Sequence, residues 1–239
     1  MLSDFAYRLI RQRRRRTSAE RLSYRKLLLE QLEDRRMLSL EPVIWDGGGD
    51  NNWQTAANWV DDVAPVTNDD LIFPVVAAQT SNFNGFPAGT SFGSILIEGN
   101  NYDLSGNSVV LNGSVTNNGT GNTFGIDVEM GSTGGFANSS ASTFTVTGDI
   151  NTAGNALTLN SAVTNVTTLF SGSISGSGSV VTGGSGITVL AGDNSYLGTT
   201  TVAGGVVSVR HDHALCESTR AYVWERAEAA VGARSVRQQ

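Results

Sequence analysis

The chain has 239 residues, of which 39% are hydrophobic and 16% are charged, and its formal net charge is −6. The charge is unevenly distributed, because no lysine or arginine occurs from Met37 to Val209. A stretch without basic side chains offers no counter-charge to phosphate, which excludes it as a binder of nucleic acid or anionic lipid. Thirteen carboxylates lie in this stretch: Glu41, Asp46, Asp50, Asp61, Asp62, Asp69, Asp70, Glu98, Asp103, Asp127, Glu129, Asp149 and Asp193.

Cysteine content and hydropathy set further bounds. The single cysteine, Cys216, excludes an intrachain disulfide framework, so the fold must depend on its core and on hydrogen bonds. No apolar run approaches the ~18 residues of a membrane-spanning helix. None reaches the roughly 7–15 apolar residues of an ordinary signal peptide either. We therefore expect neither a membrane-spanning segment nor a signal peptide of that kind.

Residues 1–40 are predicted to form an Arg-rich leader with an amphipathic helix. A basic cluster runs from Arg11 to Arg16. Leucines then recur at three- to seven-residue spacing, which predicts a helix from about Ser18 to Arg36. Guanidinium groups pair with phosphates, but a single short cluster ahead of an acidic domain favours a leader over a nucleic-acid site. We expect export, with processing near Leu38 to Leu40.

Residues 41–210 are predicted to form short strands separated by turns. Apolar residues alternate with polar ones from Phe124 to Met130, which is typical of half-buried strands. Short aliphatic runs bounded by Gly, Asn or Ser supply further strands. This spacing fits a β-sandwich or a β-solenoid, and the abundance of Asn, Gly, Ser and Thr favours the solenoid. The inward positions are predicted to be Phe124, Ile126, Val128, Phe144, Val146, Ile187 and Val189.

Residues 211–239 break this pattern and are predicted to be an atypical tail from a truncated or frame-shifted gene. Charges of both signs appear, together with the only cysteine and an Ala-rich helical sequence from Tyr222 to Ala233. His211 and His213 form an H-x-H pair with Cys216 three positions later. A metal site there lacks a further ligand cluster in the sequence, so chance is the favoured interpretation.

Two segments carry a family resemblance. Trp45, Trp53 and Trp59 form a W…W…NW pattern, and residues 192–202 read GDNSYLGTTTV. The chain from Ile44 to Val209 resembles the autotransporter-associated β-strand repeat family, which repeats G-x-N-x-Y-x-G-x-T-x-V; the clearest repeat lies near 174–209. It departs from the family at Leu197-Gly198-Thr199, where Thr-Gly-Gly is usual, and it lacks the lysine before the repeat strand.

The second resemblance lies at the end of the leader. Residues 29–39 read LEQLEDRRMLS, which is similar to the N-terminal segment of many large exported proteins of planctomycete-type bacteria. Together the resemblances imply an all-β fold, a right-handed parallel β-helix of the pectin-lyase-like, extracellular type. They imply no ligand.

Aromatic and acidic residues near the start of the β region are the main candidates for chemistry. The three tryptophans are candidates for a sugar-stacking platform, although aromatics at a first coil more often cap a solenoid. The acids are candidates for calcium binding or glycoside hydrolysis, but they lack calcium-loop spacing and are better explained as solvated turn residues. These acids are Asp46, Asp50, Asp61, Asp62, Asp69 and Asp70.

The sequence therefore predicts an exported, non-enzymatic β-solenoid with a structural or adhesive role at the cell surface. We assign no catalytic, cofactor-binding or metal-binding residue and no cofactor. The expected partner is a surface glycan or matrix protein, and no nucleic acid. The alternatives are a carbohydrate-active β-helix enzyme and a bare carbohydrate-binding module.

Overall fold

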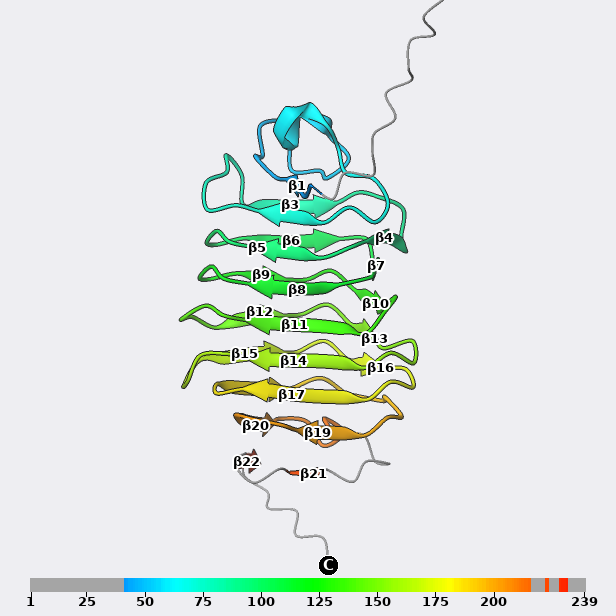
Figure 1. The fold of residues 1–239 in the computed structure, drawn as a ribbon, viewed down its shortest axis with the longest axis vertical. Helices are drawn as coiled ribbons and strands as arrows, with labels where there is room; N and C mark the ends of the chain where they lie inside the picture. Colours follow the sequence, from blue (N-terminus) through cyan, green and yellow to red (C-terminus); the bar gives the residue numbers. More distant parts are fainter. Residues whose placement is uncertain (1–40, 216–221, 224–227, 232–239) are drawn as a thin grey trace, which may run out of the picture. The chain divides into compact units, whose positions relative to one another are not determined.

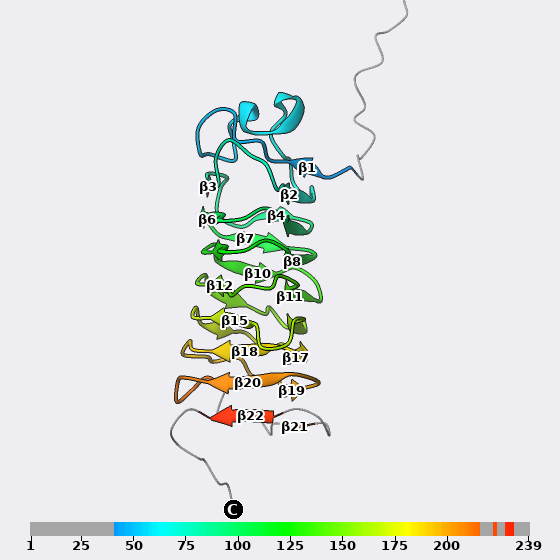
Figure 2. The ribbon, with the colours of Figure 1, turned by 90° about the vertical axis from the view of Figure 1, so that its left-hand side faces the viewer.

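The computed structural model describes residues 41–215, 222–223 and 228–231, which form a right-handed parallel β-solenoid (Figure 1). Every pairing between its strands is parallel, within these described residues. The five coils from Leu71 to Ser175 pass in turn through three sheets, and the coils after them have strands in two of the three. Among the described residues, the nine-stranded sheet (sheet 1) and the eight-stranded sheet (sheet 3) lie on opposite sides of the stack (Figure 2). The predicted solenoid is confirmed, and the sandwich alternative is wrong.

The strands are short and stack in register along each sheet. In the described residues, sheet 1 has nine strands: β1 (Val43–Ile44), β2 (Leu71–Phe73), β5 (Ile95–Ile97), β8 (Ser114–Asn117), β11 (Gly134–Asn138), β14 (Leu157–Ser161), β17 (Val180–Gly184), β19 (Thr200–Val202) and β21 (Tyr222–Val223). Sheet 2 has five: β4 (Thr90–Phe92), β7 (Val109–Leu111), β10 (Val128–Met130), β13 (Ile150–Asn151) and β16 (Ile174–Ser175). Sheet 3 has eight: β3 (Ser81–Asn84), β6 (Asp103–Gly106), β9 (Thr123–Phe124), β12 (Phe144–Val146), β15 (Thr167–Phe170), β18 (Ile187–Leu190), β20 (Val206–Val209) and β22 (Glu228–Val231).

Alternation of apolar and polar residues continues around the corners of each coil. The run from Phe124 to Met130 is not one strand, because β9 belongs to sheet 3 and β10 to sheet 2. Ile126 lies in the corner between them and is nevertheless fully buried. The inward-facing side chains therefore keep their period of two through the bend, which fills the interior continuously.

The predicted register is wrong at β18. Thr188 and Leu190 are the inward residues there, paired with the buried Thr168 and Phe170 of β15. Val189 is buried but is not part of the core cluster, and Ile187 is only partly buried. The other five predicted inward residues are confirmed as core: Phe124, Ile126, Val128, Phe144 and Val146.

Buried polar side chains hydrogen-bond along the stack as well as within a coil. Asn117 donates from Nδ2 to Asn138 Oδ1 in the next coil and accepts from Asn122 Nδ2. A hydroxyl cluster lies lower in the stack, where Ser161 Oγ donates to Thr168 Oγ1 and lies 3.1 Å from Thr188 Oγ1. These contacts satisfy the hydrogen-bonding groups of the buried polar side chains. They also fix how each coil is aligned with the next along the stack.

The repeat-like segment 192–202 has alternating inward and outward residues. Asn194, Tyr196, Thr200 and Val202 are buried, and Tyr196 Oη lies 2.6 Å from Thr200 Oγ1. The intervening odd-numbered residues from 193 to 199 are exposed, including Leu197 at 69%. Both outward departures from the family pattern, Leu197 and Thr199, therefore fall where packing constrains side-chain identity weakly.

The two terminal zones lie largely outside the described residues. The leader of residues 1–40, with its Arg11–Arg16 cluster and expected helix, is outside them. In the tail, the expected helical pattern from Tyr222 to Ala233 is wrong at two segments. Strands β21 and β22 pair in parallel with β19 and β20, so these segments extend sheets 1 and 3.

Candidate functional site

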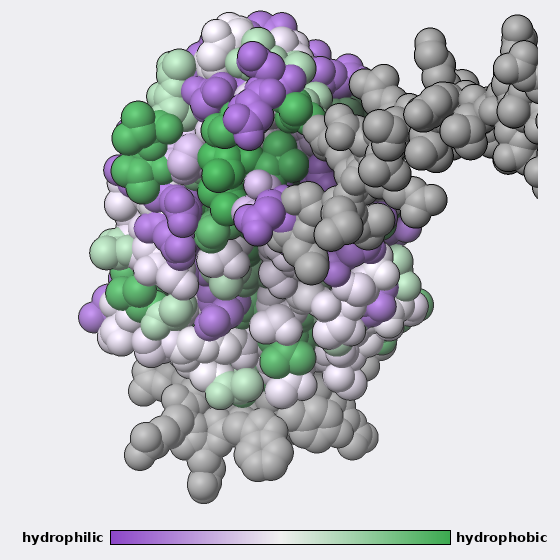
Figure 3. All heavy atoms as spheres, turned by 45° about the horizontal axis from the view of Figure 1, so that its top comes forward, coloured by the Kyte–Doolittle hydropathy of each residue, from purple (hydrophilic) through white to green (hydrophobic). Residues whose placement is uncertain are grey.

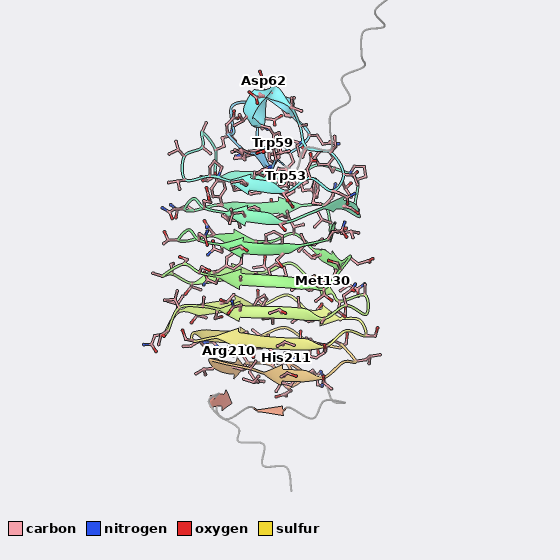
Figure 4. The ribbon with its side chains drawn as sticks, in the orientation of Figure 1. Trp53, Trp59, Asp62, Met130, Arg210 and His211 are labelled. Carbon is pink, nitrogen blue, oxygen red and sulfur yellow. The ribbon has the colours of Figure 1, made fainter. Side chains whose placement is uncertain are left out.

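Three tryptophans form a cap on the N-terminal end of the solenoid, where Figure 4 labels Trp53 and Trp59. Trp45, Trp53 and Trp59 are all 0% exposed, and they surround Phe73 at ring-centroid distances of 5.5–6.0 Å. Two short 3₁₀ turns, η1 (Ala56–Asn58) and η2 (Val60–Asp62), carry the chain over them. The cap covers the apolar interior that the first coil would otherwise expose.

Each of the three indole N–H groups of the cap donates a hydrogen bond. Trp53 Nε1 donates to Asn82 Oδ1 at 2.8 Å, Trp59 Nε1 donates to the carbonyl of Trp53, and Trp45 Nε1 donates to the carbonyl of Gln79. A sugar-stacking platform requires an exposed aromatic face. The stacking hypothesis for these three residues is therefore wrong, and the capping hypothesis is confirmed.

Large apolar side chains that stay exposed gather near the same end. Among the described residues, the exposed large hydrophobics are Val60, Val66, Val75, Val76, Phe83 and Leu197. All but Leu197 precede β4. Figure 3 shows apolar surface at this end interleaved with polar side chains. Val75 and Val76 are the most exposed in the cap region, at 69% and 84%, and lie between β2 and β3.

Four of the six candidate acids, Asp46, Asp50, Asp69 and Asp70, accept hydrogen bonds from backbone N–H groups. Asp46 accepts from the N–H of Gly48, and Asp69 accepts from the N–H of Val66. Asp70 accepts from the N–H of Ser94, which belongs to the next coil. Asp61 and Asp62 are exposed on η2 with positive φ. None of the six belongs to a group of three or more potential ligands within the described residues.

Asp50 is the acid most strongly tied into the cap. It accepts hydrogen bonds from the N–H of Asn52, from Asn58 Nδ2 and from Thr55 Oγ1. These three donors, led by the Asn52 N–H, lower the pKa of Asp50 below its ordinary value of 3.8. The shift has a structural cause, because the hydrogen bonds stabilise the ionised carboxylate.

Asp193 and the two histidines of the tail come together in space. His213 Nδ1 lies 2.9 Å from Asp193 Oδ1, and His211 Nδ1 lies 3.7 Å from the same oxygen. The two imidazole centroids are 5.6 Å apart. This is the one group of three His, Cys, Asp or Glu side chains in the described part of the chain whose ligand atoms lie within 4.8 Å of one another.

Asp193 was not predicted from the sequence as the partner of the H-x-H pair. Cys216, the residue considered there, lies outside the described residues. Asp193 is 20 residues before His213 and comes beside it only because Leu190 pairs with Val209 in the next coil. Extending the pairing of Leu190 with Val209 along both segments places Asp193 opposite Asp212, between the two histidines.

Comparison with protein families, with curated proteins and with solved structures finds no match for this chain. In the described residues, no helix is long and apolar enough to cross a membrane.

Proposed function

We propose that this protein is an exported β-solenoid of the autotransporter-associated repeat type, with a structural or adhesive role at the cell surface. It acts without catalysis, as a hydrogen-bonded rod that displays variable turns to a surface glycan or a matrix protein. Its acidic residues accept hydrogen bonds that hold turns and coils together, and they keep the surface of the rod hydrated. The Arg-rich leader of residues 1–40, with its planctomycete-type segment, directs it out of the cytoplasm.

The observation that carries this proposal is the structural use of the outward carboxylates. Asp127 Oδ1 accepts the N–H of Asp149 in the next coil at 2.8 Å, and Asp149 Oδ1 accepts the N–H of Ser173 in the coil after that at 2.7 Å. These acids join coils at one corner of the stack. Polysaccharide hydrolysis instead needs two carboxyl groups facing a substrate across about 5–9.5 Å, one of them with a raised pKa.

The absence of basic side chains from Met37 to Val209 also supports a non-enzymatic role. Cleavage of anionic polysaccharides on β-helices typically relies on basic residues, and this stretch contains none. Its uniform negative charge keeps neighbouring rods apart and soluble. A structural or display role needs no further chemistry from these side chains.

Export is tested by fusing residues 1–45 to a reporter in a bacterial host with a comparable envelope. We expect the reporter outside the cytoplasm, and a variant with Arg13–Arg16 replaced by Gln should remain inside. A wild-type fusion that stays wholly cytoplasmic would contradict the export proposal.

Catalysis and adhesion are separated with the purified full chain. We expect binding to cells or matrix preparations without turnover of neutral or acidic polysaccharides. Turnover that Asp70→Asn abolishes, with the circular dichroism spectrum unchanged, would favour the enzyme.

Adhesion is probed with Val75→Ser/Val76→Ser, because these side chains are exposed and apolar. Trp53→Ala is unsuitable as a binding probe, because Trp53 is buried in the cap.

A further inference from the structure

We propose that Asp193, His211 and His213 form a binding site for a divalent transition-metal ion such as Zn²⁺. The site joins two consecutive coils at the corner that follows β18 and β20. It is independent of the adhesive role proposed above. Imidazole and carboxylate are the ligand types that Zn²⁺, Ni²⁺ and Cu²⁺ share.

The stacking of the coils places the three side chains. Leu190 of β18 pairs with Val209 of β20, so the residues that follow each strand leave the sheet one above the other. Asn194 reinforces this alignment, because its N–H donates to the carbonyl of His213 and its Nδ2 donates to the carbonyl of Ala214. The backbones that carry the ligands are therefore fixed to each other by hydrogen bonds.

Asp193 differs from the acids above it at the same corner. Asp127 and Asp149 each accept a backbone N–H from the coil below. Asp193 instead accepts from an imidazole, and the N–H of His213 is taken by His211 Nδ1 at 3.2 Å. Higher in the stack, the aspartate at this corner joins two coils through a backbone hydrogen bond. Asp193, at the same corner, instead faces the Nδ1 atoms of two histidines.

The distances between the donor atoms suit a small ion. Metal–ligand bonds of about 2.0–2.2 Å to nitrogen and oxygen place tetrahedral ligand atoms roughly 3.3 Å apart. The observed separations from Asp193 Oδ1, 2.9 Å to His213 and 3.7 Å to His211, lie on either side of this value. The side chains are 67%, 53% and 40% exposed for Asp193, His213 and His211, so water can complete the coordination.

Binding replaces two existing contacts. The ion takes the place of the hydrogen bond between His213 Nδ1 and Asp193. The proton of the neutral imidazole moves from Nδ1 to Nε2, which leaves the Nδ1 lone pair for the ion. The ion also displaces the His213 N–H from His211 Nδ1, which costs little because the exposed N–H can bond to water. Two charged neighbours flank the histidines: Arg210 opposes a cation and Asp212 favours it.

The test uses the full chain, freed of metal by chelation and titrated with ZnCl₂ by calorimetry and by NMR. His211 and His213 are the only histidines in the chain, so their two imidazole signals are unambiguous. We expect one Zn²⁺ per chain, shifts in both imidazole signals, and a melting temperature raised by about 2–4 °C at saturating Zn²⁺. Ca²⁺ prefers all-oxygen ligands, so CaCl₂ should cause none of these three effects.

Variants decide whether these three side chains hold the ion. Asp193→Asn and His213→Ala should each weaken Zn²⁺ binding at least tenfold with the circular dichroism spectrum unchanged, since all three side chains are on the surface. Asp212→Asn and Cys216→Ser should bind Zn²⁺ with an affinity within about twofold of that of wild type. Wild-type affinity in the double variant His211→Ala/His213→Ala, or loss of binding in Cys216→Ser, would overturn the proposal. Imidazole signals that do not move in wild type would overturn it equally.

Discussion

The Oδ1 atom of Asn194 lies 2.7 Å from the backbone nitrogen of Ile174, which belongs to the preceding coil. On its other side, Asn194 Nδ2 donates to the carbonyl of Ala214 in the following coil, also at 2.7 Å. The side chain is only 4% exposed, so neither backbone group can turn to water if the amide is removed. One buried amide therefore joins three coils, which explains why this position of the repeat-like segment carries Asn.

We expect Asn194→Ala to lower the free energy of unfolding by about 2–4 kcal/mol, because it leaves a buried N–H and a buried carbonyl without partners. Urea denaturation followed by circular dichroism measures this change. Ser195→Ala is the matched control, since Ser195 is the next residue and is exposed. Equal effects of the two changes would show that the amide does not join the coils.

The inward register of β18 is tested by a second pair of variants. Leu190 is 0% exposed and pairs with Phe170, whereas Ile187 is partly buried on the opposite face. We expect Leu190→Ala to cost about 2–5 kcal/mol in the free energy of unfolding and Ile187→Ala less than about 1 kcal/mol. Denaturant titration of both variants decides the register. A larger loss for Ile187→Ala would restore the register predicted from the sequence.

The solenoid could be predicted because its short strands and its turns are visible in short stretches of the sequence. Turns rich in Gly and Asn punctuate short apolar runs, and amides such as Asn117 and Asn138 stack between coils. The register of β18 was not predictable, because Ile187-Thr188-Val189-Leu190 has aliphatic residues in both phases. Only the pairing with Phe170 selects Leu190, and the neighbouring hydroxyl of Ser161 makes Thr188 acceptable inside.

The candidate metal site was hidden from the sequence for a different reason. Coils differ in length, as shown by Val146 pairing with Phe170 and Leu190 pairing with Val209. Without the pairing, nothing marks Asp193 as the neighbour of His213. The role of the tryptophans was easier to anticipate, since any solenoid has an open end that large apolar side chains must cover.

Close approach between coils at Gly192 yields a third prediction. A Cβ atom there would overlap the carbonyl oxygen of Gly172 in the preceding coil, which is rigid backbone. We expect Gly192→Ala to cost about 1–3 kcal/mol. Gly183 is the control: a Cβ atom there meets only Asn160 Oδ1, at 3.9 Å, so Gly183→Ala should be neutral or stabilising by up to about 1 kcal/mol. Thermal melts distinguish the two, and equal melting temperatures would contradict the close stacking.

The last prediction concerns acid stability and Asp50. Its pKa in the folded protein is lowered below 3.8, chiefly by the N–H of Asn52 and then by Asn58 and Thr55. A carboxyl whose folded pKa is depressed stabilises the fold above its unfolded pKa, and this contribution is lost as the pH falls through the folded value. We therefore expect Asp50→Asn to be less stable than wild type near neutral pH. The difference should shrink as the pH falls below 3.8, because wild-type Asp50 then becomes neutral as well.

Urea denaturation of wild type and Asp50→Asn over a series of pH values measures this difference. Asp103→Asn is the control, because Asp103 is an exposed acid in β6, outside the cap. We expect its stability near neutral pH to differ little from that of wild type. A stability difference for Asp50→Asn that is the same near pH 7 and well below pH 3.8 would show that the three hydrogen bonds do not favour the ionised carboxylate. In that case the cap would be held by the packing and the indole hydrogen bonds of its tryptophans, and acid would leave it intact.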